Sequence, residues 1–448
     1  RLHDVPFLER RFQIGGIEPF DPVPQGEIRR DRLLGLEADD SPHRFRHIQP
    51  LPIEKELSLE RCPIEETRIH GGRLYWLTVT RSCGCAGWET GPAHQTRRGV
   101  AVPMFEIRSA GYMVGMSPSD APSLIPPVRG DWTDLVLRRV RGETIGTTPP
   151  IPDDPVTDDD LQLALYLWYE LSYRGLEGVP DEMEWDLGIL EVRLAMERAL
   201  EASLHDAVPH EEIAPDEVAD RLRSLDDPVS PFGVYLEREA TLEQYREFVI
   251  HRSSYHLKEA DPHTFALPRI SGGAKAAFAE IQADEYGGGK PERVHARLFA
   301  SMMEGLGLDT RNGAYLASIP GVTLANVNLM SFFGMHRRWR AAAVGHLALF
   351  ELGSPLPNRR YGNGLRRLGF GPEVTDFHDE HVEADAVHSL IATYDLAARL
   401  AGDHPELAGD VIFGARALQF VEGVSADHML TAWKANRSSL LGTLVPTA

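Results

Sequence analysis

Cysteine is scarce in this chain of 448 residues, which contains three of them. So small and odd a number excludes a disulfide-stapled secreted fold and is typical of proteins in a reducing compartment. No run of 18 or more apolar residues occurs, so we expect no membrane-spanning helix. The first residues also lack the basic and then apolar pattern of a signal peptide. We therefore expect a cytoplasmic protein.

Basic residues are also fewer than acidic residues. The chain has 46 Lys and Arg against 67 Asp and Glu, which gives a formal net charge of −21. An acidic surface repels phosphate backbones, so we expect no nucleic-acid partner. The charge favours solubility but does not identify a substrate.

The cysteines do not define a metal site. Together with His70 or His94 they would supply the donors of a Cys3His site, but only two of the three are close in sequence. The Cys-x-His and Cys-x-x-His pairs of a Rieske centre do not occur. We interpret the cysteines as incidental; they are Cys62, Cys83 and Cys85.

The N-terminal third of the chain differs in composition from the rest. Residues 1–155 are rich in Pro, Gly and Arg, and proline pairs after Ile125 and Thr148 interrupt any helix. We expect an irregular or poorly ordered region, with much of 1–110 disordered or upstream of the true start. The candidate start residues are Met104, Met113 and Met116. A small folded N-terminal module is the alternative.

Residues 156–440 are predicted to form one helix after another. Apolar residues recur at helical spacing, and Pro or Gly separates the segments. Since we find no alternating strand pattern and no internal repeat, we predict an all-α bundle. After a first helix that begins near Thr157, the expected helices cover 182–204, 215–224, 239–260, 274–286, 291–306, 321–352, 373–402 and 405–434.

One of these helices carries three ligand-type side chains on one face. His381, Asp385 and His388 stand at positions i, i+4 and i+7, which 3.6 residues per turn place on a single stripe. Burying such groups unpaired is costly, and a metal ion would neutralise and coordinate them. Taken alone, the motif also fits a solvated face with a chance pattern.

Three further ligand candidates lie on other predicted helices. Glu285 ends one helix, and His295 lies in the first turns of the next, after a glycine-rich bend. Glu351 is a carboxylate in a strongly apolar helix, where an unpaired charge is seldom buried. In isolation, the carboxylates also fit solvated helix ends.

Glu259 is one of several candidate ligands that lie close together in the sequence. It precedes Pro262 in a segment that also holds His256, Asp261 and His263. We rank Glu259 first, although spacing does not decide between these groups. Carboxylates and imidazoles without thiolates suit iron or manganese rather than structural zinc, and several of them within a helical bundle suit a two-metal site.

The order of the candidate ligands resembles that of a known family. The set is Glu259, Glu285, His295, Glu351, His381, Asp385 and His388. A helix glutamate, a histidine, a glutamate and then His-x3-Asp-x2-His is similar to the haem-oxygenase-like di-iron oxidases and oxygenases, also described as iron-containing redox enzymes. The Glu-x-x-His pairs of ferritin-like proteins do not occur in this pattern. The resemblance implies a seven-helix, haem-oxygenase-like bundle without haem over residues 156–440.

The resemblance also implies a cofactor and a reaction class. Members of the family bind two iron ions, Fe(II) or Fe(III), and use O2 through a peroxo-di-iron(III) intermediate. Reported outcomes are N-oxygenation of amines and oxidative C–C cleavage of fatty acids or amino acids. N-oxygenating members have an extra glutamate shortly before the first histidine, and Glu285 occupies that position. We therefore expect a non-haem di-iron oxidoreductase, with N-oxygenation favoured and the role of Glu285 open.

Other functions remain as alternatives. A non-catalytic iron-binding or oxygen-sensing bundle would use the same ligands. A thiamin-metabolising protein of similar fold would not need these ligands. A haem-binding oxygenase would need one proximal histidine. For the enzyme we expect a small-molecule substrate and an external electron donor, and we leave a homodimer open.

Several further residues have expected supporting roles. Asp284 and Glu383 are expected to orient the histidines, and the helix over 321–352 is expected to line a dry pocket. Three arginines either neutralise a substrate carboxylate or are solvated and paired on the surface; they are Arg359, Arg360 and Arg366.

Overall fold

Helices form the regular structure in the described part of the chain. The computed structural model describes residues 117–144, 146–226 and 230–442, which fall within one unit, Val102–Ala448. Among these residues, β-type backbone pairing is limited to one isolated bridge, between Ser123 and Leu176. The predicted all-α class is confirmed. None of the described helices is long and apolar enough to cross a membrane.

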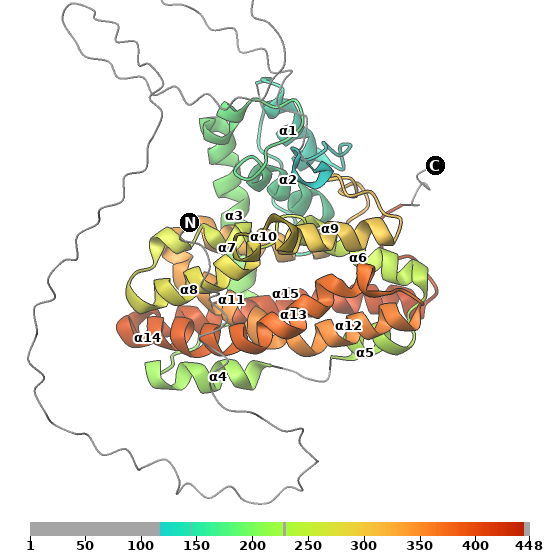
Figure 1. The fold of residues 1–448 in the computed structure, drawn as a ribbon. Helices are drawn as coiled ribbons and strands as arrows, with labels where there is room; N and C mark the ends of the chain where they lie inside the picture. Colours follow the sequence, from blue (N-terminus) through green and yellow to red (C-terminus); the bar gives the residue numbers. More distant parts are fainter. Residues whose placement is uncertain (1–116, 145, 227–229, 443–448) are drawn as a thin grey trace, which may run out of the picture. The chain divides into compact units, whose positions relative to one another are not determined.

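The first long helices pack together at one side of the unit. They are α1 (Asp131–Val140), α2 (Asp159–Glu170) and α3 (Leu187–Ala207) (Figure 1). Asp158 caps α2 by accepting hydrogen bonds from the backbone N–H groups of Asp160 and Leu161. The cap was predicted at Thr157, one residue earlier, and an acidic cap at this end also suits the helix dipole.

Helix α1 lies in the segment that the sequence predicted to be irregular. The Asp160 carboxylate accepts hydrogen bonds from the backbone N–H groups of Trp132, at 2.7 Å, and Thr133, at 3.0 Å. A residue of α2 therefore caps α1, and Val136 of α1 is fully buried. Local sequence could not reveal a helix whose cap comes from another element. The predictions made for residues 1–116, including the three cysteines, lie outside the described residues.

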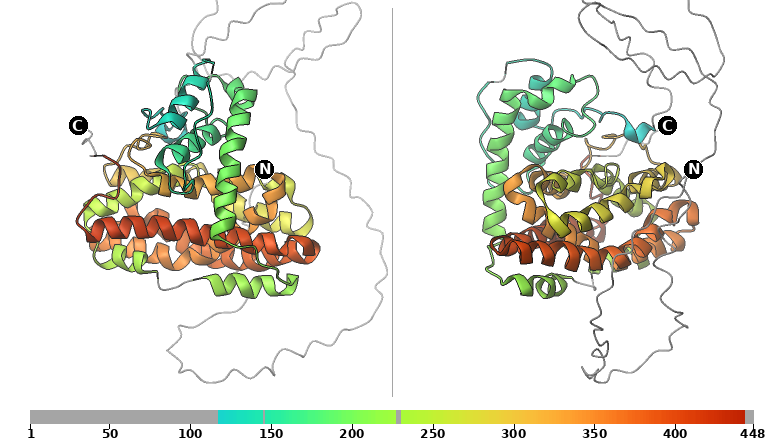
Figure 2. Two further views of the ribbon diagram at one scale, coloured as in Figure 1. Left: turned by 180° about the vertical axis from the view of Figure 1, so that it is seen from behind. Right: turned by 60° about the vertical axis from the view of Figure 1, so that its left-hand side comes forward.

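The bundle that follows contains the helices on which the site depends. The long ones are α6 (Leu242–His256), α8 (Gly272–Glu285), α9 (His295–Gly305), α10 (Gly321–Met335), α11 (Arg340–Gly353), α12 (Pro355–Arg367), α13 (Pro372–Leu390) and α15 (Ala408–Lys434). The shorter ones are α4 (Val218–Leu225), α5 (Pro231–Arg238), α7 (Asp261–Thr264) and α14 (Arg399–Asp403). The views in Figures 1 and 2 show α15 running along the length of this bundle.

Helices α11 and α15 approach each other closely because glycines face the contact. A Cβ atom on Gly345 would lie 1.7 Å from the carbonyl oxygen of Val411, and one on Gly414 would lie 2.0 Å from that of Ala342. No larger residue fits at either position without separating the two helices. This contact holds the helix that carries Glu351 against the C-terminal helix.

Two predicted helices are interrupted in the structure. The helix predicted over 321–352 is divided into α10 and α11 by a 3-10 turn, Arg337–Trp339. There His336 leaves helical geometry, and its Nε2 lies 2.9 Å from the Glu197 carboxylate of α3. The helix predicted over 373–402 continues from α13 into a π-helical segment, Ile391–Ala398. Such segments are frequent next to functional sites, and this one begins three residues after His388.

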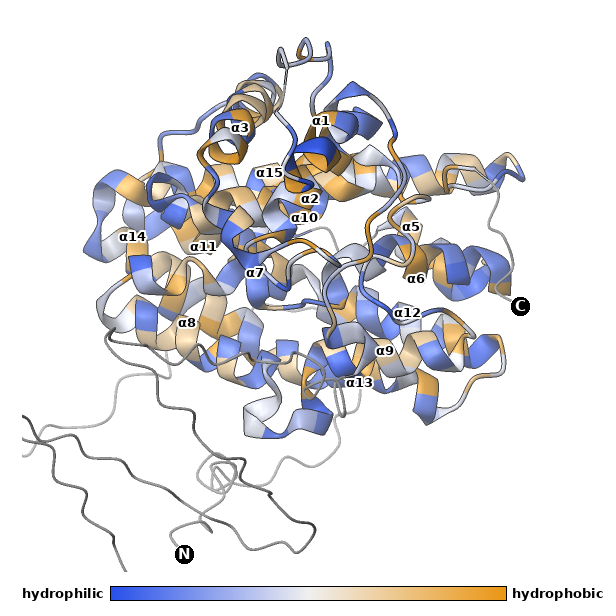
Figure 3. Cartoon of the chain, turned by 90° about the horizontal axis from the view of Figure 1, so that it is seen from above, coloured by the Kyte–Doolittle hydropathy of each residue, from blue (hydrophilic) through white to orange (hydrophobic). Residues whose placement is uncertain are grey.

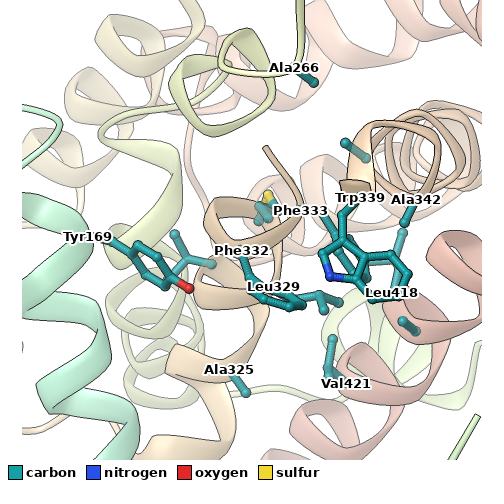
Figure 4. Packing of buried hydrophobic residues seen from close by; sticks show 14 of the residues in the cluster. Tyr169, Ala266, Ala325, Leu329, Phe332, Phe333, Trp339, Ala342, Leu418 and Val421 are labelled. Carbon is teal, nitrogen blue, oxygen red and sulfur yellow. The ribbon is translucent and has the colours of Figure 1, made fainter. Parts of the chain in front are cut away.

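The main hydrophobic core surrounds α10. Fourteen consecutive residues of this helix, Gly321–Gly334, are buried. The rings of Phe332 and Phe333 lie 6.1 and 5.9 Å from that of Trp339. Tyr169 of α2 and Leu418 of α15 belong to the same cluster (Figure 4). Around this core, polar and apolar residues alternate along the outer helices (Figure 3). The core fixes the relative positions of the helices that carry the site.

Candidate metal centre

Five elements bring the seven predicted ligands into one buried region. Glu285 ends α8, His295 begins α9, Glu351 belongs to α11, and Glu259 lies between α6 and α7. The stripe His381, Asp385 and His388 lies on α13. Each of the seven residues is no more than 6% exposed. The alternative of solvated carboxylates and imidazoles therefore does not apply to them.

The seven residues form two groups that share one member. In the first group, one ligand atom from each side chain lies within 4.8 Å of the others; the members are Glu259, Glu285, His295 and His381. The second group meets the same limit; its members are Glu285, Glu351, Asp385 and His388. Glu285 belongs to both groups, so its two carboxylate oxygens face both halves of the site.

A tight glycine turn brings Glu285 and His295 together. Gly287 has a φ of 73°, and a Cβ there would lie 2.7 Å from the backbone of Arg293 and Val294. The chain therefore reverses directly after α8 and returns to start α9. As a result Nδ1 of His295 lies 2.9 Å from Oε2 of Glu285.

A distortion at the end of α6 positions Glu259. Helix α6 ends at His256, and Ala260 adopts a left-handed φ of 74°, which is strained for a residue with a Cβ. This turn directs Glu259 inward, where its Oε1 lies 3.5 Å from Nε2 of His381 and 3.5 Å from Nε2 of His256. Of the four groups that competed in this segment, Glu259 is the one that joins the metal-ligand groups.

Hydrogen bonds orient the two histidines of α13. Nδ1 of His381 lies 2.7 Å from the carbonyl oxygen of Phe377, and Nε2 of His388 lies 3.1 Å from the Asp284 carboxylate. Their other ring nitrogens face the carboxylates, as is usual for metal-binding histidines. Asp284 thus lies where the sequence predicted a supporting role. Glu383, the other predicted supporting residue, is exposed on α13 and does not face the site.

The site leaves buried polar atoms without hydrogen bonds. Among the described residues, no hydrogen-bond partner exists for Oε2 of Glu259, Nδ1 of His295, Oδ1 of Asp385 or Nδ1 of His388. Such atoms are rare in folded proteins because each one costs free energy. All four belong to the predicted ligand set and point into the region between the carboxylates. Nitrogen and oxygen donors of this kind fit iron or manganese ions.

The crowded carboxylates favour protonation of several residues of the site. Burial, and then the charge of Asp385, raises the pKa of Glu351 to about 8. Burial opposes protonation of His388, but the neighbouring carboxylates of Asp284, Asp385 and Glu351 outweigh it and raise the pKa of His388 to about 12. Similarly, the Glu259 carboxylate overcomes burial and raises the pKa of His381 to about 10. Without metal, protons held by these residues partly balance the four carboxylates.

Two cavities adjoin the groups. A small one, of about 10 Å³, lies between the ligands and is also lined by Tyr255, His263 and Phe350. A larger cavity of about 400 Å³ shares Phe350 with it and reaches outward between α5, α6, α12 and α15. The apolar helix predicted to line a dry pocket contributes Leu347 and Phe350 through α11.

Sequence reasoning missed Tyr255 and ranked His263 below Glu259, although both are buried residues of the small cavity. Tyr255 and His263 stand four residues before and after Glu259, and this one-turn spacing was the available signal. Nε2 of His263 lies 3.0 Å from Nδ1 of His346, and burial lowers the pKa of both histidines. They are therefore neutral groups beside the ligands.

The predicted arginines lie on or near the surface. Arg366 is bound to Asp379 at 2.6 Å, so for Arg366 the paired alternative applies. Arg359 is exposed, and Arg360 is half-buried. None of the three lines either cavity described above.

Comparison with known proteins agrees with this geometry. Residues 246–422 match a family described as iron-containing redox enzymes. The matched segment contains all seven residues of the two groups, and the match confirms the predicted resemblance. No curated protein matches the chain.

Proposed function

We propose that the chain, whose residues 246–422 match a family described as iron-containing redox enzymes, is a di-iron, O2-dependent oxidase or oxygenase of a small molecule. The observation that carries the proposal is the position of Glu285 in both buried ligand groups. A carboxylate common to two groups of donors is suited to bridging two metal ions. Four buried polar atoms without hydrogen-bond partners lie in the same region, which supports the presence of a bound cation.

The residues divide between the two proposed ions. Glu259, His295 and His381 would hold one iron, while Glu351, Asp385 and His388 would hold the other, with Glu285 shared. When bound, the iron pair supplies the electrons and coordination positions for the reduction of O2.

The protein contributes orientation and the exclusion of water. The carbonyl of Phe377 and the carboxylate of Asp284 fix the two α13 histidines, which keeps their free nitrogens directed at the site. Tyr255 and Phe350 close the small cavity with apolar rings. An external electron donor would restore the reduced state, and a homodimer is compatible with this proposal.

Two outcomes of the oxidation have support. N-oxygenation of an amine is favoured by Glu285, because the extra glutamate occurs at that place in the N-oxygenating branch that the chain resembles. Oxidative C–C cleavage of a fatty acid or amino acid is the alternative, which the resemblance to the family also implies. Analysis of products by mass spectrometry distinguishes an N-oxide or hydroxylamine from a shortened carbon chain.

Metal content and gas uptake test the proposal directly. The full chain, loaded with Fe(II) without oxygen and desalted, is expected to retain two irons per chain and to consume O2 when a reductant is supplied. Iron bound without O2 consumption would support the non-catalytic, oxygen-sensing alternative. A folded chain that retains no iron would reject the di-iron assignment.

A further inference from the structure

The turn that carries Glu259 is held in a strained conformation. It follows the end of α6 at His256 and includes Ala260, whose φ of 74° is left-handed. A residue with a Cβ atom keeps such a conformation only where the surrounding structure fixes it. The contacts of the residues beside Glu259 therefore decide where its carboxylate points.

Lys258, the residue before Glu259, is buried and bound to α2. It is 1% exposed, and its Nζ pairs with the carboxylate of Glu170, which is fully buried at the end of α2. The other carboxylate oxygen of Glu170 accepts a hydrogen bond from Asn312 at 2.9 Å. Nζ of Lys258 also lies 4.2 Å from the centre of the Tyr166 ring, within the range of a cation–π contact. Because a buried charge is costly away from its partner, these contacts confine Lys258 to one position.

Arg174 holds the backbone of the same turn. It lies four residues after the end of α2, and its Nη1 donates to the carbonyl oxygens of Leu257, at 2.5 Å, and Ser119, at 2.9 Å. The hydroxyl of Tyr166 donates to the carbonyl oxygen of Ser254 at 3.3 Å. The carbonyls of Ser254 and Leu257 lie at the C-terminal end of α6, where carbonyl groups lack partners within the helix. Side chains from α2 and the segment after it supply those partners.

The residues that hold the turn precede the segment that matches the family. The match covers residues 246–422, which include the turn, whereas Tyr166, Glu170 and Arg174 lie before it. The N-terminal helices of this chain thus contact the proposed metal centre through the residues next to Glu259.

We propose that Glu170 and Arg174 are positioning residues, whose contacts with Lys258 and Leu257 hold the strained turn so that Glu259 faces His381. The inference rests on the proposed function only in treating Glu259 as a metal ligand. Glu259 belongs to one of the two ligand groups and not to the other. Loss of these contacts is therefore expected to weaken one metal position and to leave the second in place.

Hydrogen exchange in the metal-free full chain tests the hold on the turn. The backbone N–H groups of Lys258 and Asp261 are hydrogen-bonded there, at 2.8 and 3.1 Å. In Glu170→Gln these amides are expected to exchange at least about fivefold faster than in the wild type, because a neutral amide binds the Lys258 ammonium group less strongly. The amides of α15 are expected to exchange at the wild-type rate. Wild-type exchange at the turn would overturn the proposal.

A second variant carries the same test if Glu170→Gln does not fold. The Arg174 side chain is 19% exposed, so Arg174→Met is a milder change that removes the donor to Leu257. It is expected to speed exchange at the turn in the same way. Arg174→Lys keeps a charge and a donor and is expected to restore most of the protection. Equal exchange in the Met and Lys variants would reject the role of the donor.

Tyr169→Phe is the matched control. Tyr169 precedes Glu170 on α2, and its buried hydroxyl donates to Glu197 of α3 at 2.9 Å. The substitution removes a buried contact of the same helix that involves α3 rather than the turn. Exchange at the turn and metal binding are expected to stay as in the wild type. Faster exchange at the turn in this control would show that any weakening of α2 has the same effect, which would overturn the specific role of Glu170.

Titration with Co(II), followed by visible absorption, tests the consequence for the metal centre. The wild-type chain is expected to bind two ions, since nitrogen and oxygen ligands suit this metal. In Glu170→Gln and Arg174→Met, one binding event is expected to weaken about tenfold and the other to stay unchanged. Equal weakening of both events would indicate a loss of overall stability and overturn the positioning role.

The two measurements separate failure of this inference from failure of the proposed function. Faster exchange at the turn in a chain that binds no Co(II) would reject the two-metal site and still support the hold on Glu259. Two binding events of wild-type strength in variants with faster exchange would overturn the positioning role and leave the proposed function intact.

Discussion

Nδ1 of His295 lies 2.9 Å from Oε2 of Glu285, yet the geometry between them is not that of a hydrogen bond. Two buried metal-ligand atoms this close together, with no hydrogen bond between them, indicate that both face the same bound ion. Because Glu285 also belongs to the second ligand group, this one carboxylate links both halves of the site. The contact therefore supports a two-metal site more strongly than the spacing of the α13 residues does.

Removal of the shared carboxylate is expected to affect both metal positions. Glu285→Ala should lower iron retention from two ions per chain to one or fewer, because each group then loses a ligand. Elemental analysis after desalting measures this change. Glu292→Gln, an exposed carboxylate in the same connection, serves as the control and should retain two. Unchanged iron content in Glu285→Ala would remove this residue from the site.

Loss of a histidine from α13 is expected to abolish activity without unfolding the bundle. His388→Ala should reduce iron-dependent O2 consumption to background, since His388 is within reach of three carboxylates of its group. The far-ultraviolet circular-dichroism spectrum should remain helical. His404→Ala changes a partly exposed histidine after α14 and should behave as wild type. Retained O2 consumption in His388→Ala would exclude it as a ligand.

Metal binding is expected to strengthen with rising pH. The raised pKa values of His388, about 12, and His381, about 10, mean that both are protonated in the metal-free protein near neutral pH. These raised values stabilise the metal-free fold below the unfolded histidine pKa, and that contribution is lost as the pH rises through the folded values. The pKa of Glu351, raised to about 8, acts in the same direction because its proton stabilises the folded state.

Since an iron ion must displace these protons, binding releases them and becomes more favourable at higher pH. The increase in Tm on anaerobic addition of Fe(II) should therefore be larger at about pH 8 than at about pH 6. Proton release measured in weak buffer provides a second readout. A Tm increase that is independent of pH would contradict the assignment of these histidines as ligands.

The contact between α11 and α15 should not tolerate a side chain. Gly345→Ala is expected to lower the free energy of unfolding by about 2–3 kcal/mol, because its Cβ would lie 1.7 Å from the Val411 carbonyl oxygen. Urea denaturation measures this loss. Gly402→Ala in α14 is the matched control, since nothing lies within 4 Å of its added Cβ. Its stability should be unchanged or slightly higher, in keeping with the better helix propensity of alanine.

The bundle is expected to fold without the first 110 residues. The described core includes α1, which packs on α2 and receives its cap from Asp160. A chain that starts at residue 111 should therefore keep its helical spectrum and its iron content. Aggregation of the truncated chain would show that the N-terminal region contributes a domain on which the bundle depends.

Local sequence determined the parts of the site that lie on one helix. The spacing of His381, Asp385 and His388 fixes a common face, because the helical repeat alone places i, i+4 and i+7 together. The pairing of Glu285 with His295 was also predictable, since a run of glycines permits the reversal between α8 and α9. All-helical class followed from the apolar periodicity of the C-terminal segments.

Tertiary structure decided what depends on contacts between helices. Glu259 joins the ligand groups, rather than the other candidates in its segment, because Ala260 adopts a left-handed conformation. Packing imposes this conformation, and the sequence does not predict it. Helix α1 was missed because Asp160, on the following helix, caps it. The placement of Glu285 in both ligand groups arises only where α8, α9, α11 and α13 meet. The larger cavity beside Phe350 arises only where α5, α6, α12 and α15 surround it. Helical periodicity sets the face on which a side chain lies, but only close packing of the core sets the distances between faces.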